Sequence, residues 1–310
     1  MLQQKISFSQ AAITLKFMFN SLFTPKIKSE PLVSVIIPTF NWSAALKQTI
    51  ISVLNQKYMN YEILVIGDCC TDDSEQIVKS FNDKRIKWYN LDKNYGSQFG
   101  PNNFGLKVAT GKYVAYVNHD DIWLKNHLSW SVYQLEKYDS ILSISNCIIL
   151  GPEKSNIFRI TNHKIDKMNG SWTPPSSILH RLGAIQTVGY WKDFRDTTFP
   201  IDTEFISRFF SYSFGIINVP TITVVKFPAS WKIDAYKLKE SKQQEILNKR
   251  LRRGKFYVTL LMIKFWFIRR RETVEFNPQS PVNQKVQYEN YRDSINNNRK
   301  IRGLPEISID

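Results

Sequence analysis

The sequence predicts an α/β fold in which a mostly parallel sheet is flanked by helices, with a basic helical extension at the C-terminus. From residue 32 to about residue 150, short β-branched runs alternate with segments of helical periodicity. This alternation is typical of βαβ units. An apolar content of 43% over 310 residues is enough to build a buried core, so the composition argues against a disordered chain.

The elements of the first half follow from periodicity and turn residues. We expect strands at residues 33–37, 61–66, 85–89, 112–117 and 141–150. Leu46, Ile50 and Leu54 recur at helical spacing after the first strand. Asp72 and Glu75 resemble a capping box and predict a helix at 74–81. Further helices are expected near 102–109 and from Asp121 to about Tyr138.

The pattern is less regular after residue 150. We expect a loop at 169–175, in which Trp172 either stacks on an acceptor sugar or packs in a core or lid. Helices are expected at 176–188 and 201–210, and two short strands at 216–219 and 222–225, separated by Pro220. The chain is basic and helical beyond Trp231, and the Asn- and Arg-rich tail after about Phe276 is expected to be poorly ordered.

The net charge of +15 indicates an anionic partner, such as a phosphate-bearing substrate, an acidic membrane or a nucleic acid. No nucleic-acid recognition motif occurs in the sequence, and no G-x-G-x-x-G follows a predicted strand. A nucleic-acid-binding protein and a Rossmann dehydrogenase are therefore disfavoured. Three cysteines without metal-type spacing favour a reducing compartment and no disulfide framework.

Two adjacent carboxylates, Asp120 and Asp121, follow the apolar run at residues 113–117. The carboxyl end of a buried strand is where open α/β sheets bind ligands. Two carboxylates there repel each other unless a cation intervenes, and their hard oxygens suit Mg²⁺ or Mn²⁺ bound to phosphates. From these residues alone a helix N-cap is an equal alternative, because Ile122 begins a helical pattern.

Four features occur in a specific order along the chain. They are the strand and turn at 33–41, the acidic loop at 67–73, the glycine-containing pair of segments at 94–96 and 103–105, and Asn118-His119-Asp120. A further acid, Asp202, follows Pro200. Together these features resemble the family-2 inverting glycosyltransferases of GT-A fold, which have a Rossmann-like nucleotide-binding sheet. The resemblance covers about residues 32 to 230.

The resemblance implies a nucleotide-diphosphate sugar donor, a divalent metal (Mn²⁺ or Mg²⁺) and a hydroxyl acceptor, a glycan or a lipid-linked one. The implied nucleotide-sugar-binding residues are Pro38, Thr39, Asp68, Asn118 and Asp120, with Asp68 on the base and Asn118 near the ribose. Asp120 and Asp121 are the implied metal ligands, and Asp202 is the implied general base. The chemistry agrees with these roles, because the leaving diphosphate needs its charge neutralised and the incoming hydroxyl needs a base.

The sequence departs from the family pattern at several positions. Asn118 replaces the first acid of the DXD motif, as in a subgroup with a His-Asp-Asp variant; Gly67, Asn102 and Ile201 stand where relatives have an acid, an arginine and a glutamate. His119 is either a ligand or a residue packed beside the carboxylates. The departures leave a catalytically silent nucleotide-sugar-binding or scaffold protein as the alternative.

We divide the chain into an N-terminal amphipathic extension (1–30), a GT-A domain (31–230) and a basic helical C-terminal region with a tail (231–310). Residues 31–121 form the expected nucleotide-sugar-binding half of the domain, and residues 122–230 form the acceptor-side half.

Residues 251–271 contain seven basic side chains and no acid around an aromatic and aliphatic run. The run is too short and too charged to span a bilayer but suits an anionic membrane surface; a core-packed terminal helix is the alternative. Because the N-terminus has no convincing signal peptide, we expect a cytoplasmic enzyme, peripheral on the inner face of the membrane, acting in envelope or surface glycan synthesis.

Overall fold

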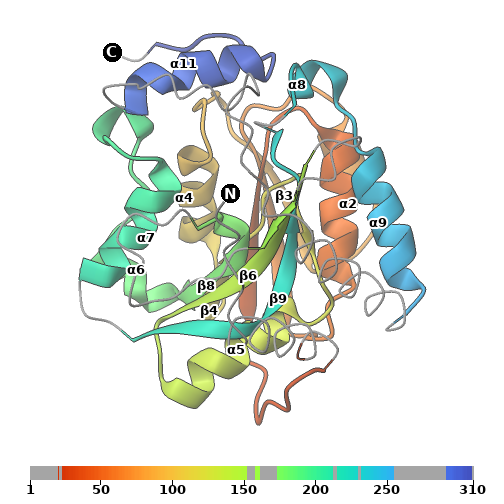
Figure 1. The fold of residues 1–310 in the computed structure, drawn as a ribbon, viewed down its shortest axis with the longest axis vertical. Helices are drawn as coiled ribbons and strands as arrows, with labels where there is room; N and C mark the ends of the chain where they lie inside the picture. The colour runs from red at the N-terminus through yellow and green to blue at the C-terminus, as the bar shows by residue number, and fades with distance from the viewer. Residues whose placement is uncertain are drawn as a thin grey trace, which may run out of the picture.

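A nine-stranded sheet, ordered β3-β2-β1-β4-β8-β6-β9-β5 with β7 beside β6, forms the centre of the computed structural model. The structure describes residues 20, 23–151, 158–160, 173–211, 215–229, 232–254 and 291–308. Helices cover both faces of the sheet (Figure 1). This arrangement confirms the predicted α/β fold.

The first part of the sheet is parallel and places four strand ends at one edge. Its strands are β1 (Val33–Thr39), β2 (Tyr61–Gly67), β3 (Ile86–Asn90) and β4 (Tyr113–Tyr116). They are connected through α2 (Ser43–Leu54), α3 (Ser74–Ser80) and α4 (Phe99–Val108). Because parallel strands run in the same direction, the residues that follow β1, β2 and β4 gather at the carboxyl edge.

The second part of the sheet is mixed. It contains β5 (Ile122–Trp123), β6 (Leu142–Leu150), β7 (Phe158–Ile160), β8 (Ile178–Arg181) and β9 (Ile216–Lys226). The helices of this part are α5 (His127–Tyr138), α6 (Ile185–Val188) and α7 (Ile201–Ser211). β8 is antiparallel to both β4 and β6, whereas β6 and β9 are parallel.

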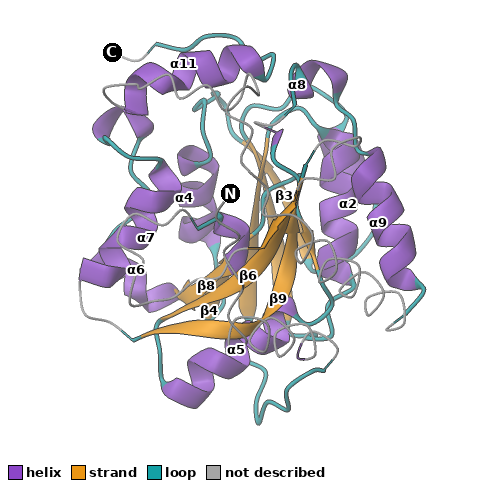
Figure 2. Ribbon diagram, viewed as in Figure 1, coloured by secondary structure: helices purple, strands orange, loops and turns teal. Residues whose placement is uncertain are grey.

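Two apolar layers hold the sheet between its helices. Val35 and Ile37 of β1 pack on the side of α2 and α5, and Ile36 packs on the side of α4 and α7. The central strands are buried on both faces, which explains their continuous β-branched runs. Figure 2 shows α4, α6 and α7 on one side of the sheet and α2 on the other.

The helix expected at 176–188 is wrong in its first half. Residues Pro175–Ser177 form a single 3-10 turn, and β8 follows before α6 begins at Ile185. The apolar run of β8 fills the gap between β4 and β6, so sheet pairing outweighs the local helical pattern. The helix expected directly after Asp121 begins only at His127, because Ile122–Trp123 pairs with β9.

The two strands expected around Pro220 form one strand, β9. Its pairing with β6 shifts register between Ile144 and Asn146, opposite the residues that flank Pro220. A proline has no N–H to donate to the ladder, so it is tolerated at such an irregularity.

The C-terminal region returns to the sheet. After α8 (Ala235–Leu238), α9 (Lys242–Arg252) packs against α2, where the Asn248 side chain donates a 2.9 Å hydrogen bond to the carbonyl of Gln48. The expectation of a poorly ordered tail is wrong for residues 291–308, which form α11 (Tyr291–Ile301) and an extended segment with buried contacts.

Several predictions lie outside the described residues. They concern most of the extension at 1–30, the loop residues 169–172 with Trp172, and residues 255–271 of the basic aromatic segment. In the part of the chain that the structure describes, no helix has the length and apolar character needed to cross a bilayer.

Candidate active site

The strand-end residues expected to bind the nucleotide lie side by side at the carboxyl edge of the sheet. The last residues of β1 and β2, Thr39 and Gly67, are paired. The Asp68 N–H donates a 2.8 Å hydrogen bond to the Thr39 carbonyl. The N–H of Val117, just after β4, donates to the Ile36 carbonyl. The register therefore brings Pro38, Thr39, Asp68 and Asn118 to one edge.

Asp68 is a buried acid held by the loop at residues 94–96. Its side chain is 5% exposed, and its Oδ1 accepts a 2.8 Å hydrogen bond from the Tyr95 N–H. Burial raises the pKa of the Asp68 carboxyl to about 6, against the opposing effects of the Tyr95 and Gly96 N–H groups and the Arg299 charge. Asp68 thus combines a fixed position with a carboxyl that titrates near neutral pH.

Gly67, which departs from the family pattern, has no room for a side chain. A Cβ at this position would lie 2.5 Å from Asn90 Oδ1 and 2.8 Å from the Trp88 ring. Asn90 is itself fixed, because it accepts a hydrogen bond from the Cys70 N–H and donates one to the Cys70 carbonyl. An acid at position 67 would therefore disrupt the loop that carries Asp68.

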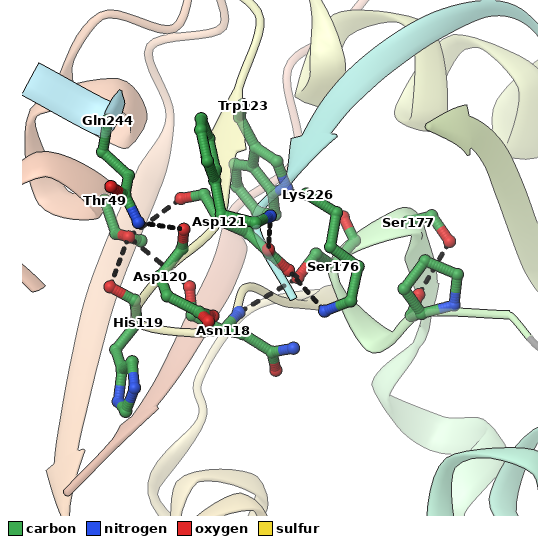
Figure 3. A network of polar contacts seen from close by, with 12 residues as sticks. Thr49, Asn118, His119, Asp120, Asp121, Trp123, Ser176, Ser177, Lys226 and Gln244 are labelled. Atoms are coloured by element: carbon green, nitrogen blue, oxygen red, sulfur yellow. Dashed lines mark hydrogen bonds and ion pairs between the residues drawn. The ribbon is translucent and has the colours of Figure 1, made fainter. Parts of the chain in front are cut away.

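Residues 118–121 form a turn that is held by hydrogen bonds from two other segments of the chain (Figure 3). The Thr49 hydroxyl of α2 lies 2.8 Å from both the His119 and the Asp121 carbonyls. On the other side, the Asn118 N–H donates to Ser176 Oγ at 3.0 Å. Because β5 rather than a helix follows this turn, the helix N-cap alternative is wrong.

Asp121 is buried, and both of its carboxylate oxygens make polar contacts. It is 0% exposed; Oδ2 accepts a hydrogen bond from Ser176 and lies 3.2 Å from Lys226 Nζ, while Oδ1 accepts from the Phe227 N–H. Burial acts to lower the pKa of Lys226, but the Asp121 and Asp120 charges outweigh it and raise that pKa. This geometry gives Asp121 a structural role and argues against its expected role as a metal ligand.

Asp120 differs from its neighbour. It is 6% exposed, and among the described residues no other side chain donates a hydrogen bond to its carboxylate. Burial raises the pKa of this carboxyl, and the charges of Lys226, Arg302 and Lys232 oppose that rise. Its oxygens remain available for a hard cation.

The described residues contain no group of three or more His, Cys, Asp or Glu side chains arranged for a metal ion. A lone carboxylate fits a Mg²⁺- or Mn²⁺-type ion when the substrate phosphates supply most of the other ligands. Asp120 has the chemistry for that arrangement.

His119 is packed beside the carboxylates. Its ring lies edge-on to Trp42 and Tyr236, its Nδ1 accepts a hydrogen bond from the Phe40 N–H, and its Nε2 lies 3.4 Å from the Tyr236 hydroxyl. Burial lowers the pKa of His119 to about 4, so the ring is neutral at pH 7. With both nitrogens engaged, the packing interpretation is favoured over the ligand interpretation.

The sequence profile of glycosyl transferase family 2 matches residues 34–217, which include the whole edge just described. The chain belongs to this family. It is 29% identical over 204 residues to TuaG of Bacillus subtilis, named for teichuronic acid biosynthesis; the match covers 65% of this chain and 71% of TuaG.

Other family-2 relatives match over shorter stretches. WfgD of Escherichia coli, a UDP-Glc:α-D-GlcNAc-diphosphoundecaprenol β-1,3-glucosyltransferase, is 35% identical over 126 residues, 39% of this chain and 49% of WfgD. An uncharacterized glycosyltransferase of Rickettsia typhi is 36% identical over 110 residues, and the matched part spans about a third (34%) of that protein. The relatives are glycosyltransferases, several of them in cell-envelope polysaccharide synthesis.

The fold is also that of a solved glycosyltransferase. TarS of Staphylococcus aureus, crystallised with UDP-GlcNAc, superposes with a TM-score of 0.54 at 21% identity, over 63% of this chain and 58% of the TarS chain. This likeness supports the GT-A fold.

The expected base of the family-2 reaction, Asp202, lies in the first turn of α7. It is 9% exposed, and its Oδ1 accepts a 2.8 Å hydrogen bond from the Thr203 N–H. Glu204, the nearest competing acid, is paired with Lys192 at 2.9 Å and with Arg208 at 3.2 Å. Ile201, where relatives have a glutamate, packs in the apolar layer with Phe205.

Sequence reasoning missed the side chains that hold the family-2 site in place, among them Thr49, Ser176, Lys226 and Tyr236. Lys226 left a signal, because a lone lysine at the end of an apolar strand needs a buried acid as its partner. The other three are a helix threonine, a serine after two prolines and a tyrosine in a basic region. Their local sequence carries no such signal, since only the tertiary fold brings them to residues 118–121.

Proposed function

We propose that this chain is an inverting glycosyltransferase that moves a sugar from a nucleoside diphosphate to a hydroxyl acceptor in a cell-envelope glycan. The observation that carries the proposal is the edge of the sheet itself: Asp68 and Asp120 are buried acids that follow β2 and β4, at the edge where β1 ends, in a chain of family 2. Crystallised TarS held UDP-GlcNAc, which supports a nucleotide-sugar donor here.

In this proposal each acid has one task. Asp68 accepts a hydrogen bond from the base, beside Pro38 and Thr39, and Asn118 lies near the ribose. Asp120 holds a divalent metal, which neutralises charge on the leaving diphosphate. Asp121 keeps the turn in place through Lys226.

Asp202 is the proposed general base. It accepts the proton of the acceptor hydroxyl while that oxygen attacks the anomeric carbon and the bond to the diphosphate breaks. A single displacement of this kind inverts the anomeric configuration. Glu204, the competing acid, is engaged in ion pairs with Lys192 and Arg208, so we assign the base to Asp202, at the position implied by the family.

The acceptor and the location follow from the relatives and the charge. WfgD is named for a diphosphoundecaprenol-linked acceptor, so we infer a lipid-linked acceptor for this chain as well. The basic residues at 251–271 would keep the enzyme at the anionic inner surface of the membrane, where such lipids are available.

The test has two parts. Calorimetric titration of the full chain with UDP, GDP, CDP and TDP, each with Mn²⁺, is expected to show binding of at least one; Asp120→Ala should lose the metal-dependent part. Hydrolysis or transfer of the matching nucleotide sugar should then fall about 10²- to 10⁴-fold in Asp202→Asn with donor binding retained.

Glu204→Gln is the matched control and should keep most of its activity. Full transfer by Asp202→Asn would show that the base lies elsewhere. Binding without any turnover in the wild type would favour the alternative, a catalytically silent nucleotide-sugar-binding protein.

A further inference from the structure

Residues 291–308, here called the C-terminal arm, cross the edge of the sheet that carries the site. The N–H groups of Asp234 and Tyr236 donate to the carbonyls of Ile301 and Arg302 at 2.8 and 2.9 Å. The Arg299 side chain donates to the Gly96 carbonyl at 2.8 Å, so the arm also reaches the loop that holds Asp68. In Figure 1, α11 lies at the same end of the molecule as α8, opposite α5.

The arm fits closely against both of its partners. Gly96 has a φ of +74°, and a Cβ there would lie 2.7 Å from Ile307 Cδ1. Gly303 has a φ of +77°, and a Cβ there would lie 2.8 Å from Lys237 Cγ. Gly96 lies in the loop that the arm contacts, and Gly303 lies in the arm itself. Because both glycines have a left-handed conformation that other residues rarely adopt, they indicate that the arm packs in one specific position.

The arm carries two arginines into the site, in different situations. Arg299 is 7% exposed and donates hydrogen bonds to the Pro305 and Gly96 carbonyls, so it holds the arm against the loop at residues 94–96. Arg302 has a buried Nε without a hydrogen-bond partner among the described residues. A buried guanidinium N–H that lacks a protein acceptor is suited to an anionic ligand.

Arg302 also lies near the residues that are expected to hold the donor phosphates. Its carbonyl accepts a 2.9 Å hydrogen bond from the Tyr236 N–H, and the Tyr236 hydroxyl lies 3.4 Å from Nε2 of His119, the residue before Asp120. Asn102, at the position where relatives have an arginine, is fully buried. The cation that is absent from α4 therefore has a candidate replacement at this edge, on the C-terminal arm.

We propose that Arg302 binds the diphosphate of the donor and that the C-terminal arm closes the donor pocket, with Arg299 as the positioning residue. This inference rests on the proposed function, because it concerns the same pocket. A guanidinium presents paired N–H donors that match two phosphate oxygens. The pocket is then completed by a segment that lies about 180 residues after the metal-binding turn.

The test compares Arg302→Ala and Arg302→Lys with Lys300→Ala, which removes an exposed charge from the same arm. Titrations use the nucleoside diphosphate that the wild type binds best, with Mn²⁺, and the corresponding nucleoside. Arg302→Ala should weaken diphosphate binding about 10- to 100-fold and change nucleoside binding less than threefold. Arg302→Lys should recover part of the loss, and Lys300→Ala should match the wild type.

Three results would overturn the inference. They are unchanged diphosphate affinity in Arg302→Ala, tighter binding in that variant (which would make the arm an obstacle to the donor), and an equal loss of nucleoside and diphosphate binding. Thermal unfolding of each variant identifies a folding defect, and in that case Arg302→Lys decides the question. Absence of any nucleoside diphosphate binding by the wild type would instead count against the proposed function.

Discussion

Two adjacent aspartates have opposite environments in this protein. Among the described residues, no other side chain donates a hydrogen bond to the Asp120 carboxylate, whereas the Asp121 carboxylate contacts Ser176, Lys226 and the Phe227 N–H. One peptide unit therefore separates a candidate ligand group from a structural ion pair. Of the two acids that indicated a metal site, we propose metal binding for Asp120 and a structural role for Asp121.

We predict that Asp121→Asn destabilises the fold by about 3–5 kcal/mol, because it removes the ion-pair partner that lies 3.2 Å from the buried Lys226 ammonium. Urea unfolding measures the change. The double variant Asp121→Asn/Lys226→Met is the matched control and should recover most of the loss. A single variant as stable as the wild type, with lost metal-dependent binding, would instead make Asp121 a ligand.

Asp68 should make the free energy of unfolding depend on pH. Its folded-state pKa of about 6 lies above the ordinary value of 3.8, so the folded state binds the proton more tightly than the unfolded state does. The stability linked to that proton is present below pH 3.8 and is lost as the pH rises to about 6.

Asp68→Asn keeps an oxygen for the Tyr95 N–H but cannot ionise, so it should avoid this loss. We predict that the variant equals the wild type near pH 4 and is more stable by about 3 kcal/mol above pH 7. Urea unfolding of both proteins from pH 4 to pH 8 measures the difference, in which other titrating groups cancel. A difference that is constant with pH would contradict the prediction.

At the scale of elements, close contact between helix and sheet positions the site. α4 packs on β1 and β2 through Gly105, where a Cβ would lie 2.7 Å from Ile36 Cγ2. Ile36 is fully buried in a central strand and has little freedom to move. The glycine thereby sets how close α4 comes to the strand that ends in Pro38 and Thr39.

Gly105→Ala should destabilise the protein by about 1–3 kcal/mol, because overpacking against Ile36 exceeds the gain in helix propensity. Gly183→Ala is the control, since no heavy atom lies within 4 Å of a Cβ at that position. Thermal or urea unfolding of the two variants gives the comparison. Equal stability of both would show that α4 can shift without cost.

At the scale of the whole molecule, the positive charge has two separate uses in our proposals. Arg302 brings a cation to the donor pocket, and residues 251–271 supply cations for an anionic surface. Both lie after the family-2 match, which ends at residue 217. In these proposals, the region that follows the match adapts a common fold to its substrate and its location.

The triple variant Arg269→Gln/Arg270→Gln/Arg271→Gln should bind phosphatidylglycerol-containing liposomes about 100-fold more weakly, because each cation near such a surface contributes about 1 kcal/mol. Sedimentation with these liposomes and with phosphatidylcholine liposomes measures the partitioning. Lys47→Gln/Lys84→Gln/Lys107→Gln removes three exposed charges elsewhere and is the control. Equal partitioning of the two triple variants would contradict a specific surface contact.

The sequence by itself determined the α/β class, the four parallel strands and the position of the acids at their ends. These features are local: β-branched runs and helical spacing are present along the chain, and a strand that ends in an acid identifies its own edge. The order of motifs was sufficient to predict family 2.

The tertiary structure decided where local patterns conflict with sheet pairing and which acids are free. Residues 178–181 become a strand because β4 and β6 lie on either side of them. Lys226, 105 residues after Asp121, engages that carboxylate and leaves Asp120 available. The arm, expected to be poorly ordered, brings Arg302 next to Tyr236. Each outcome depends on contacts between distant segments, and the free energy of such contacts is not encoded in any local window of the sequence.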